Sequence, residues 1–366
     1  MRSFVHRGLY RAFQYVRGIK KTGYIEPINN YEAIMDRYRS YCLKNRDAVY
    51  RFGFTGERME GAYKYVGGIE HGYSIYCTPN DSRYLYRRGE APSYTDTFSE
   101  GKYKWTGECV YNEEVYFFPR TESDMLYVNK AYRIGRIKGA SYNREHHYGG
   151  VLIGSEVVQP PRSTTHLLVW NLESRDYRRI EVCPRFLETC CRYQCSIRHP
   201  NGNAYFLPES GRVIKLNIAT KEWTFIGKHT DVMVFDAKVG MDGNIYGFSI
   251  KGGGILKIDV TNESVNAIYP DCYFGAYGTK MGINGVLYST PGTGRFVWAY
   301  DLRSETLKKV FDLEDNSYAK YAGGCTRRNG DIIGIPSFAD RFIVGKTEEE
   351  SVIPEELYRL FWEDCY

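Results

Sequence analysis

The chain has 366 residues, of which 43% are hydrophobic and 25% charged, and its formal net charge is +5. This composition predicts a soluble globular protein rather than a disordered one. No apolar stretch approaches the roughly 20 residues that a membrane span needs. The small net charge gives no argument for nucleic-acid binding by the chain as a whole, and the 34 tyrosines and 37 glycines favour strands joined by tight turns.

Residues 1–23 are basic and contain no acidic residue. Three interpretations stay open: an arm that docks on an anionic partner such as RNA or an acidic protein face, an amphipathic mitochondrial presequence, or a surface helix with solvated charges. The basic residues of the docking-arm interpretation are Arg2, Arg7, Arg11, Arg17, Lys20 and Lys21.

The segment lacks the continuous apolar core of a secretory signal, so we expect the ten cysteines to be reduced and mostly buried. The expected location is a reducing, intracellular compartment, with a virion or a mitochondrion as further options.

Residues 31–44 have apolar and aromatic residues at helical spacing and predict a helix. Residues 48–54 alternate in the manner of a strand and lie just before the first of a series of repeats.

The repeated unit has a strand that bears a tyrosine or another apolar residue and usually ends in proline. The seven strand ends recur at intervals of 40 to 47 residues, at Pro79, Pro119, Pro161, Pro208, Ser249, Pro291 and Pro336. The end of the following strand, usually a polar residue, recurs with nearly the same period. These residues are Arg87, Asn129, Asn171, Asn217, Asp259, Asp301 and Gly345. Two independent sets of positions that share one period indicate a true internal repeat.

The fourth unit shows the predicted structure most clearly. Residues 194–198 form a first strand, and the pair Asn201–Gly202 forms a tight hairpin turn in which we expect both residues to have positive φ. Residues 204–207 form a second strand, residues 213–218 form a third that alternates in polarity, and residues 222–226 form a fourth that carries Trp223. Asn217 precedes a turn in which its side chain is expected to bond the backbone.

Four short antiparallel strands per 42 or so residues are typical of one β-propeller blade. The sequence therefore predicts an all-β, seven-bladed β-propeller over residues 48–346, after an N-terminal arm and helix (1–47) and before a helical tail (347–366). The last blade lacks a clear fourth strand. Residues 48–54 are predicted to supply it and close the ring, and residues 351–353 are the competing candidate.

The repeat resembles the kelch and galactose-oxidase-like propellers. The shared features are the Asn–Gly or Asp–Gly hairpin, the tyrosine-bearing strand and the strand that ends in Asp or Asn. The glycine pairs of this chain lie in the first strand, whereas kelch units carry them after the second. The resemblance implies a propeller that acts mostly as a protein-interaction platform, and it carries no catalytic residue onto this chain.

Residues 354–362 predict a second short helix with acidic residues in its first turn. We expect both helices to pack on the outside of the ring.

Motifs for catalysis or metal binding are weak. Cys183, Cys190, Cys191 and Cys195 lack the spacing of a zinc site, and the pair His146–His147 would point to opposite sides of a strand. The triple glycine at 252–254 lacks the helix that follows a phosphate-binding loop. The sequence therefore predicts no catalytic residue, metal or cofactor.

A basic residue occurs in each predicted loop between the second and third strands of a blade. These loops are expected to share one face of the ring, where their cations form a candidate anion-binding or partner-binding site. The residues are Arg83, Arg120, Arg162, Arg212, Lys251, Arg295 and Arg341.

The leading hypothesis is a noncatalytic interaction or scaffold subunit of a larger assembly, such as a virion, a ribosome-like particle or an organellar complex. Its partners would be protein subunits, with RNA or another anionic surface bound through the arm. The alternative is a propeller enzyme or small-ligand-binding protein with its site at the mouth of the central channel.

Overall fold

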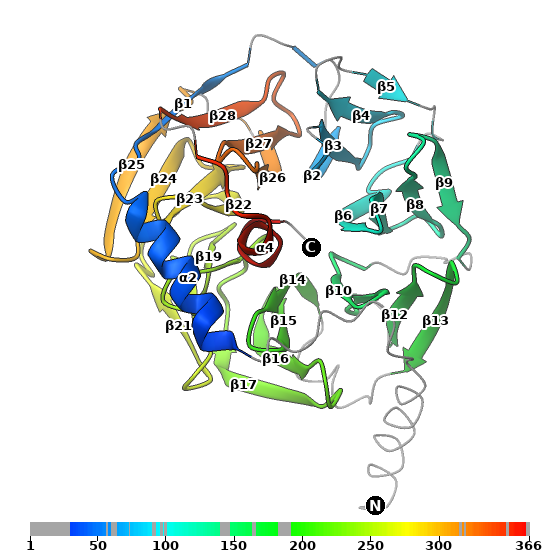
Figure 1. Cartoon of the computed structure of the whole chain (residues 1–366), viewed down its shortest axis with the longest axis horizontal. Helices are drawn as coiled ribbons and strands as arrows, with labels where there is room; N and C mark the ends of the chain where they lie inside the picture. The colour runs from blue at the N-terminus through cyan, green and yellow to red at the C-terminus, as the bar shows by residue number, and fades with distance from the viewer. Residues whose placement is uncertain are drawn as a thin grey trace, which may run out of the picture.

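Seven four-stranded antiparallel sheets surround a central axis in the computed structural model (Figure 1). The structure describes residues 30–55, 58–59, 64–72, 74–89, 93–95, 98, 101–139, 147–162, 166–181, 192–314, 317, 320–348 and 351–363. The predicted basic arm lies outside these residues. Within the described ranges, no helix combines the length and the apolar character that crossing a membrane requires.

The first four sheets follow one another along the chain, and each begins at the axis and ends at the rim (Figure 1). Their strands are β2 (Tyr65–His71), β3 (Ser74–Pro79), β4 (Leu85–Arg88) and β5 (Ser93–Thr95); β6 (Trp105–Tyr111), β7 (Glu114–Pro119), β8 (Met125–Val128) and β9 (Ile134–Ile137); β10 (Val151–Ile153), β11 (Glu156–Gln159), β12 (His166–Asn171) and β13 (Asp176–Glu181); β14 (Tyr193–His199), β15 (Asn203–Pro208), β16 (Gly211–Asn217) and β17 (Trp223–Thr230).

The fifth and sixth sheets repeat this order, and the seventh takes its outer strand from the other end of the chain. Their strands are β18 (Lys238–Val239), β19 (Ile245–Phe248), β20 (Ile255–Asp259) and β21 (Ser264–Ile268); β22 (Ala276–Met281), β23 (Val286–Pro291), β24 (Phe296–Asp301) and β25 (Thr306–Asp312); β26 (Tyr321–Thr326), β27 (Ile332–Pro336), β28 (Ile343–Thr347) and β1 (Tyr50–Phe54).

The ring closes where β1 pairs with β28, with Tyr50 opposite Thr347 and Phe54 opposite Ile343. This is the segment that the sequence analysis favoured; residues 351–353 form no strand. The closure joins strands nearly 300 positions apart, so neither the first nor the last repeat exposes an unpaired sheet face.

The sheets are held together by apolar side chains that interlock between neighbours. In the first interface, Ile69 and Tyr76 of one sheet pack with Phe117 and Leu126 of the next, and all four are buried. A single four-stranded sheet has two apolar faces, so stacking in a ring is what buries both.

In the fourth to seventh blades, the hairpins between first and second strands use Asn–Gly and Asp–Gly pairs as predicted, but their geometry differs from the expectation. Gly202 has a φ of 83°, whereas Asn201 is not among the residues with positive φ. The amide of Gly202 donates to the carbonyl of His199 (3.2 Å), and Asn201 Oδ1 accepts from the amide of Asn203 (3.1 Å). The Asn side chain thus stabilises the turn without a left-handed backbone, and the same pattern recurs at Asp242, Asn284 and Asn329.

The proline that ends the second strand marks a contact between neighbouring sheets. The residue after it, Asn80 in the first sheet, accepts through its carbonyl from the amide of Lys104 in the second (2.9 Å). Ser337 accepts in the same way from Lys64 (3.1 Å), across the boundary between the seventh and first sheets. The repeated Pro motif therefore precedes a backbone hydrogen bond that runs around the ring.

Helix α2 (Tyr31–Lys44) has the predicted bounds, and Asn30 caps it by accepting from the amide of Ala33 (3.2 Å). The C-terminal helix consists of α4 (Glu355–Leu357) and a π-helical turn, η1 (Tyr358–Trp362). The expectation that both helices pack on the outside of the ring was wrong. Both lie across one face, and α4 sits beside the central axis (Figure 1).

The physical reason is that the two helices bury each other's aromatic side chains over the ring. The rings of Tyr38 and Phe361 stack with centroids 3.8 Å apart. The indole of Trp362 donates to the carbonyl of Met281 (2.9 Å), and Tyr38 Oη donates to the carbonyl of Val239 (3.0 Å). These groups would be exposed at the rim, whereas here they cover the inner strands of the fifth to seventh sheets.

Candidate functional site

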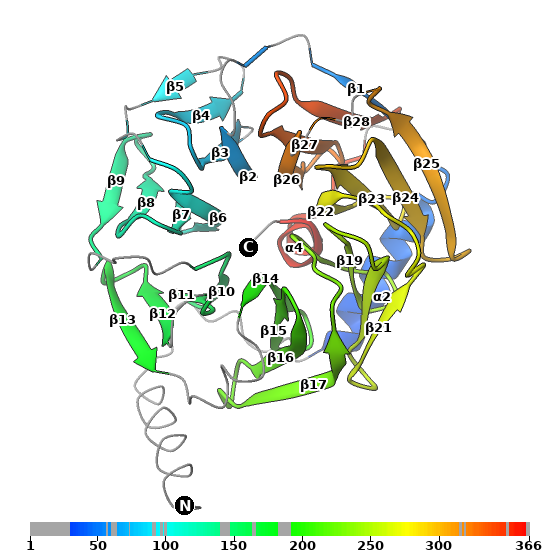
Figure 2. The same ribbon diagram turned by 180° about the vertical axis from the view of Figure 1, so that it is seen from behind.

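The two faces of the ring differ. The face that carries α2, α4 and the turns between first and second strands is called the hairpin face. The opposite face carries the loops between second and third strands and the connections from one sheet to the next, and it is called the loop face (Figure 2). Antiparallel pairing within every sheet puts these two kinds of connection at opposite ends of the strands.

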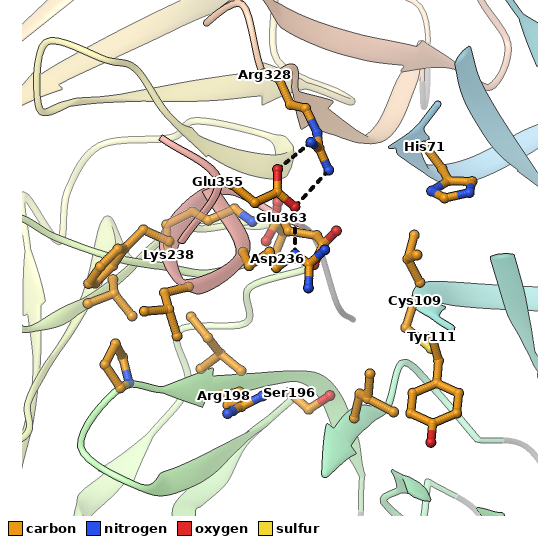
Figure 3. A pocket seen from close by; sticks show the side chains of 18 of the residues that line it. His71, Cys109, Tyr111, Ser196, Arg198, Asp236, Lys238, Arg328, Glu355 and Glu363 are labelled. Carbon is orange, nitrogen blue, oxygen red and sulfur yellow. Dashed lines mark hydrogen bonds and ion pairs between the residues drawn. The ribbon is translucent and has the colours of Figure 1, made fainter. Parts of the chain in front are cut away.

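A cavity of about 730 Å³ opens on the hairpin face at the mouth of the central channel. It lies between the inner strands of the first five sheets and the C-terminal helix, and it is called the channel cavity (Figure 3). A second cavity of about 10 Å³ lies deeper in the channel, where Gly67, Gly107 and Gly149 approach one another with Phe235. The channel therefore narrows towards the loop face.

One wall of the channel cavity is basic and polar. Strand β14 turns Ser196 and Arg198 toward the cavity because alternate residues of a strand share a face (Figure 3). Lys238, on the neighbouring strand β18, lines the same space and is only 6% exposed. Ser196 is 2% exposed, so the wall is largely removed from solvent.

A fully buried ion pair supports this wall. Lys280 Nζ lies 2.6 Å from Asp236 Oδ2, and both side chains are 0% exposed. Asp236 also accepts from the amide of Thr279 (3.1 Å). The pair joins the fifth and sixth sheets, and it neutralises the carboxylate that would otherwise oppose Lys238.

The opposite wall comes from the first two sheets. Burial lowers the pKa of His71, an effect that a hydrogen bond with the backbone of Glu113 partly opposes. Tyr111 Oη donates to Glu173 (2.6 Å), and burial together with this carboxylate raises the pKa of Tyr111 to about 12. Lys130 binds Glu113 (2.8 Å) and lowers the pKa of that carboxyl.

The third side of the cavity is the C-terminal helix. Both terminal nitrogens of Arg328 contact the Glu355 carboxylate, and Arg359 Nε lies 2.7 Å from the same group (Figure 3). Leu360 and Phe361 add apolar surface. The helix thus contributes both charge and an apolar lining to the cavity.

Six of the seven predicted basic residues lie on loop-face connections and the seventh, Arg212, lies at the start of β16, but only Arg120 and Arg162 contact a common side chain. The guanidinium groups of Arg120 and Arg162 lie 4.0 and 4.1 Å from the centre of the Tyr148 ring. Arg120 also lies 4.2 Å from the ring of Tyr103. This stack fixes two arginines between the second and third sheets.

The predicted cations are distributed around the ring, and most of them already contact other groups. Arg162 Nε binds Glu209 (3.0 Å), and Arg295 binds Asp312 through two nitrogens (2.5 and 2.7 Å). Arg212 donates to the carbonyls of Phe225 and Gly227, and Arg341 lies 3.4 Å from Asp340 and 4.8 Å from the ring of Phe54. Arg83 and Lys251 are exposed. Nearby acids and carbonyls therefore reduce the field of this ring of cations.

The residues of the channel cavity were not predicted from the sequence. A signal was present in the fourth unit, where Gln194, Ser196 and Arg198 alternate along a strand that begins at the axis. The contribution of Lys238 and the cover supplied by Phe361 depend on contacts between distant parts of the chain.

Of the four cysteines considered for zinc, only Cys195 is described; it is buried, and burial raises its pKa. Within the described ranges no three His, Cys, Asp or Glu side chains gather as metal ligands would.

The sequence matches no protein-family model and no curated protein. Its structure is similar to solved propeller structures. Virginiamycin B lyase from Staphylococcus aureus with quinupristin aligns with a TM-score of 0.67 at 11% identity, over 81% of this chain and 99% of that one. The WD40 domain of Doa1 aligns with a TM-score of 0.58 at 13% identity, over 82% of this chain and 98% of that one. YCF48 bound to D1 peptide aligns with a TM-score of 0.60 at 8% identity, over 82% of this chain and 95% of that one.

The chain is a seven-bladed β-propeller. The predicted all-β fold with four-stranded antiparallel blades is confirmed by the sheets and by these likenesses. At such low identity, the likenesses establish the fold of the propeller alone. Its neighbours include a lyase, a WD40 domain and a peptide complex, so they leave the activity of this propeller open.

Proposed function

We propose that this kelch-like propeller is a noncatalytic interaction subunit of a larger assembly and that its loop face binds a partner protein. The observation that carries the proposal is a set of exposed aromatic side chains on loop-face connections. Tyr84, Tyr103, Tyr273 and Phe338 are 43%, 36%, 56% and 42% exposed. Tyrosine, other aromatic residues and arginine are enriched in protein interfaces and supply most of their binding energy.

The basic residues of the same face support this proposal. The stack of Tyr103, Arg120, Tyr148 and Arg162 holds two cations in place before any partner binds, which reduces the entropy lost on binding. The exposed cations, Arg83 and Lys251 among them, would contact carboxylates of the partner at the edge of the interface. The structure of YCF48 bound to D1 peptide gives a precedent for peptide binding by this fold.

Two further parts of the proposal concern residues 1–23 and the location of the protein. The basic arm would bind RNA or another anionic surface, and the protein would work in a reducing, intracellular compartment, in a virion or in a mitochondrion. Binding through the arm should fall steeply with salt concentration and disappear when residues 1–23 are deleted.

The test begins with purification of the protein from its native source and identification of the chains that co-migrate with it. The affinity of the identified partner is then measured for the wild type and for the variant Tyr84→Ser/Tyr103→Ser/Phe338→Ser. We expect the triple variant to bind at least tenfold more weakly.

The matched control is Tyr132→Ser. Tyr132 is 62% exposed but lies in the turn between β8 and β9, which is on the hairpin face of the second blade. Its substitution should leave the affinity unchanged. Equal affinity of the wild type and the triple variant, or a solitary monomer with catalytic turnover, would refute the proposal.

A second candidate function is a ligand-binding protein or an enzyme with its site at the channel mouth. The channel cavity favours this candidate because its volume is in the range of small-molecule sites and polar groups converge on it. Turnover of a compound that is lost when the cavity is altered, but not when the loop face is altered, would favour this function over the first.

A further inference from the structure

The channel cavity is built like a site for a small organic molecule. Its volume of about 730 Å³ lies within the range of roughly 300 to 1,000 Å³ that such sites occupy. The β-strands of several blades form its walls, and the C-terminal helix covers one side. Rigid strands hold side chains in place more accurately than loops do.

The charged side chains of the cavity are predominantly positive. Asp236 is paired with Lys280, and Glu113 with Lys130, so neither carboxylate adds a net negative charge. The other charged side chains that line the cavity are four cations and two anions, and two of the cations, Arg328 and Arg359, contact the same anion, Glu355. The cations are Arg198, Lys238, Arg328 and Arg359, and the anions are Glu355 and Glu363.

The position of the cations strengthens their effect. Arg198 and the hydroxyl of the buried Ser196 lie side by side on β14, and Lys238, on the neighbouring inner strand β18, lines the same cavity nearer to Glu363 (Figure 3). Charges that line a concave, poorly solvated site act on a ligand more strongly than charges on an open surface. Across the cavity, apolar surface comes from Val110, Leu152 and Phe361.

We propose that the channel cavity binds a small organic anion, a carboxylate or phosphate attached to an apolar body. Its acidic group would lie against Arg198 and Ser196, with Lys238 adding to the positive potential of the cavity, and its apolar part against Val110, Leu152 and Phe361. This site is separate from the loop face and goes beyond the partner-binding function proposed above.

The test is isothermal titration calorimetry of the full chain with three probes of similar shape: 1-naphthoate, 1-naphthyl phosphate and the uncharged 1-naphthamide. At least one of the two anions should bind at least tenfold more tightly than the amide, and the tighter of the two identifies the acidic group. In the variant Arg198→Gln/Lys238→Gln, the affinity for this anion should fall at least tenfold while the affinity for the amide is unchanged.

The control variant is Arg295→Gln, which removes one positive charge from the loop face and should leave the affinity for all three probes unchanged. If the double variant does not fold, Arg198→Gln alone should still weaken binding of the anion. Equal affinity for anions and amide, an unaffected double variant, or no binding of either anion at 10 mM would overturn the proposal. The variant Tyr84→Ser/Tyr103→Ser/Phe338→Ser should bind the probes normally, so failure of this site and failure of the loop-face interface are distinguishable.

Discussion

Replacing His199 with glutamine should remove a large part of the acid sensitivity of the fold. His199 is 1% exposed and links two blades: its Nε2 donates to the carbonyl of Gly243 (2.8 Å), and its Nδ1 accepts from the amide of Asn201 (3.1 Å). Both bonds are satisfied by the neutral ring. Burial lowers the pKa of His199 to about 4, although hydrogen bonds with the Gly243 carbonyl and the Asn201 side chain partly oppose the shift.

The sign and size of the effect follow from this lowered pKa. The unfolded chain binds a proton at His199 below pH 6.5, whereas the folded chain binds it only below about pH 4. The contribution of the neutral ring is therefore fully present above pH 6.5 and is lost as the pH falls to 4. A shift of about 2.5 pKa units corresponds to roughly 3 kcal/mol of unfolding free energy.

The assay is urea denaturation of wild type and His199→Gln at pH 7, 6, 5 and 4. The difference in unfolding free energy between the two proteins should change by about 3 kcal/mol between pH 7 and pH 4, in favour of the variant at low pH. The control is His229→Gln, at a histidine whose side chain is 60% exposed, and this variant should follow the wild type. Parallel curves for wild type and His199→Gln would refute the reasoning.

Three further substitutions test the ring and its cover by urea denaturation. Gly323→Ala should destabilise by about 1–3 kcal/mol, because φ is +68° and a Cβ would lie 2.8 Å from Gly67 Cα; Gly252→Ala, in open space, should have little effect. Tyr50→Phe should cost about 1–3 kcal/mol, because the hydroxyl donates to the Gly330 carbonyl (2.7 Å) and accepts from the Ile283 amide (3.1 Å). Trp362→Ala should cost about 3–5 kcal/mol through the loss of a fully buried indole. Unchanged unfolding midpoints for these variants would contradict the packing described here.

The ring could be predicted from the sequence because its information is local and repeated. Asn217, Asp259 and Asp301 each accept from the backbone two residues later, so the same turn chemistry marks the same place in successive blades. Seven copies of a weak signal make a strong one. For the helices, the periodicity of residues 31–44 predicted the helix but not its position. No local feature of the sequence indicated that Tyr38 would stack on Phe361 across the hairpin face.

The candidate sites were harder to predict because they depend on pairings between distant residues. The Arg162–Glu209 ion pair joins residues 47 positions apart, and the stack of Arg120 on Tyr148 joins two blades. The sequence showed seven cations on one face, but it did not show which of them were already paired. Lys238 and Arg198 line the same channel cavity only because the ring places the fourth and fifth blades side by side.

The most direct test of the account is hydrogen–deuterium exchange of the propeller with and without the partner that co-purifies with it. The account predicts slower exchange on the loop face, at residues 80–84, 103–104, 273–275 and 337–339, with little change in α2 and the C-terminal helix. Slower exchange confined to α2, the C-terminal helix and the hairpin turns would contradict it.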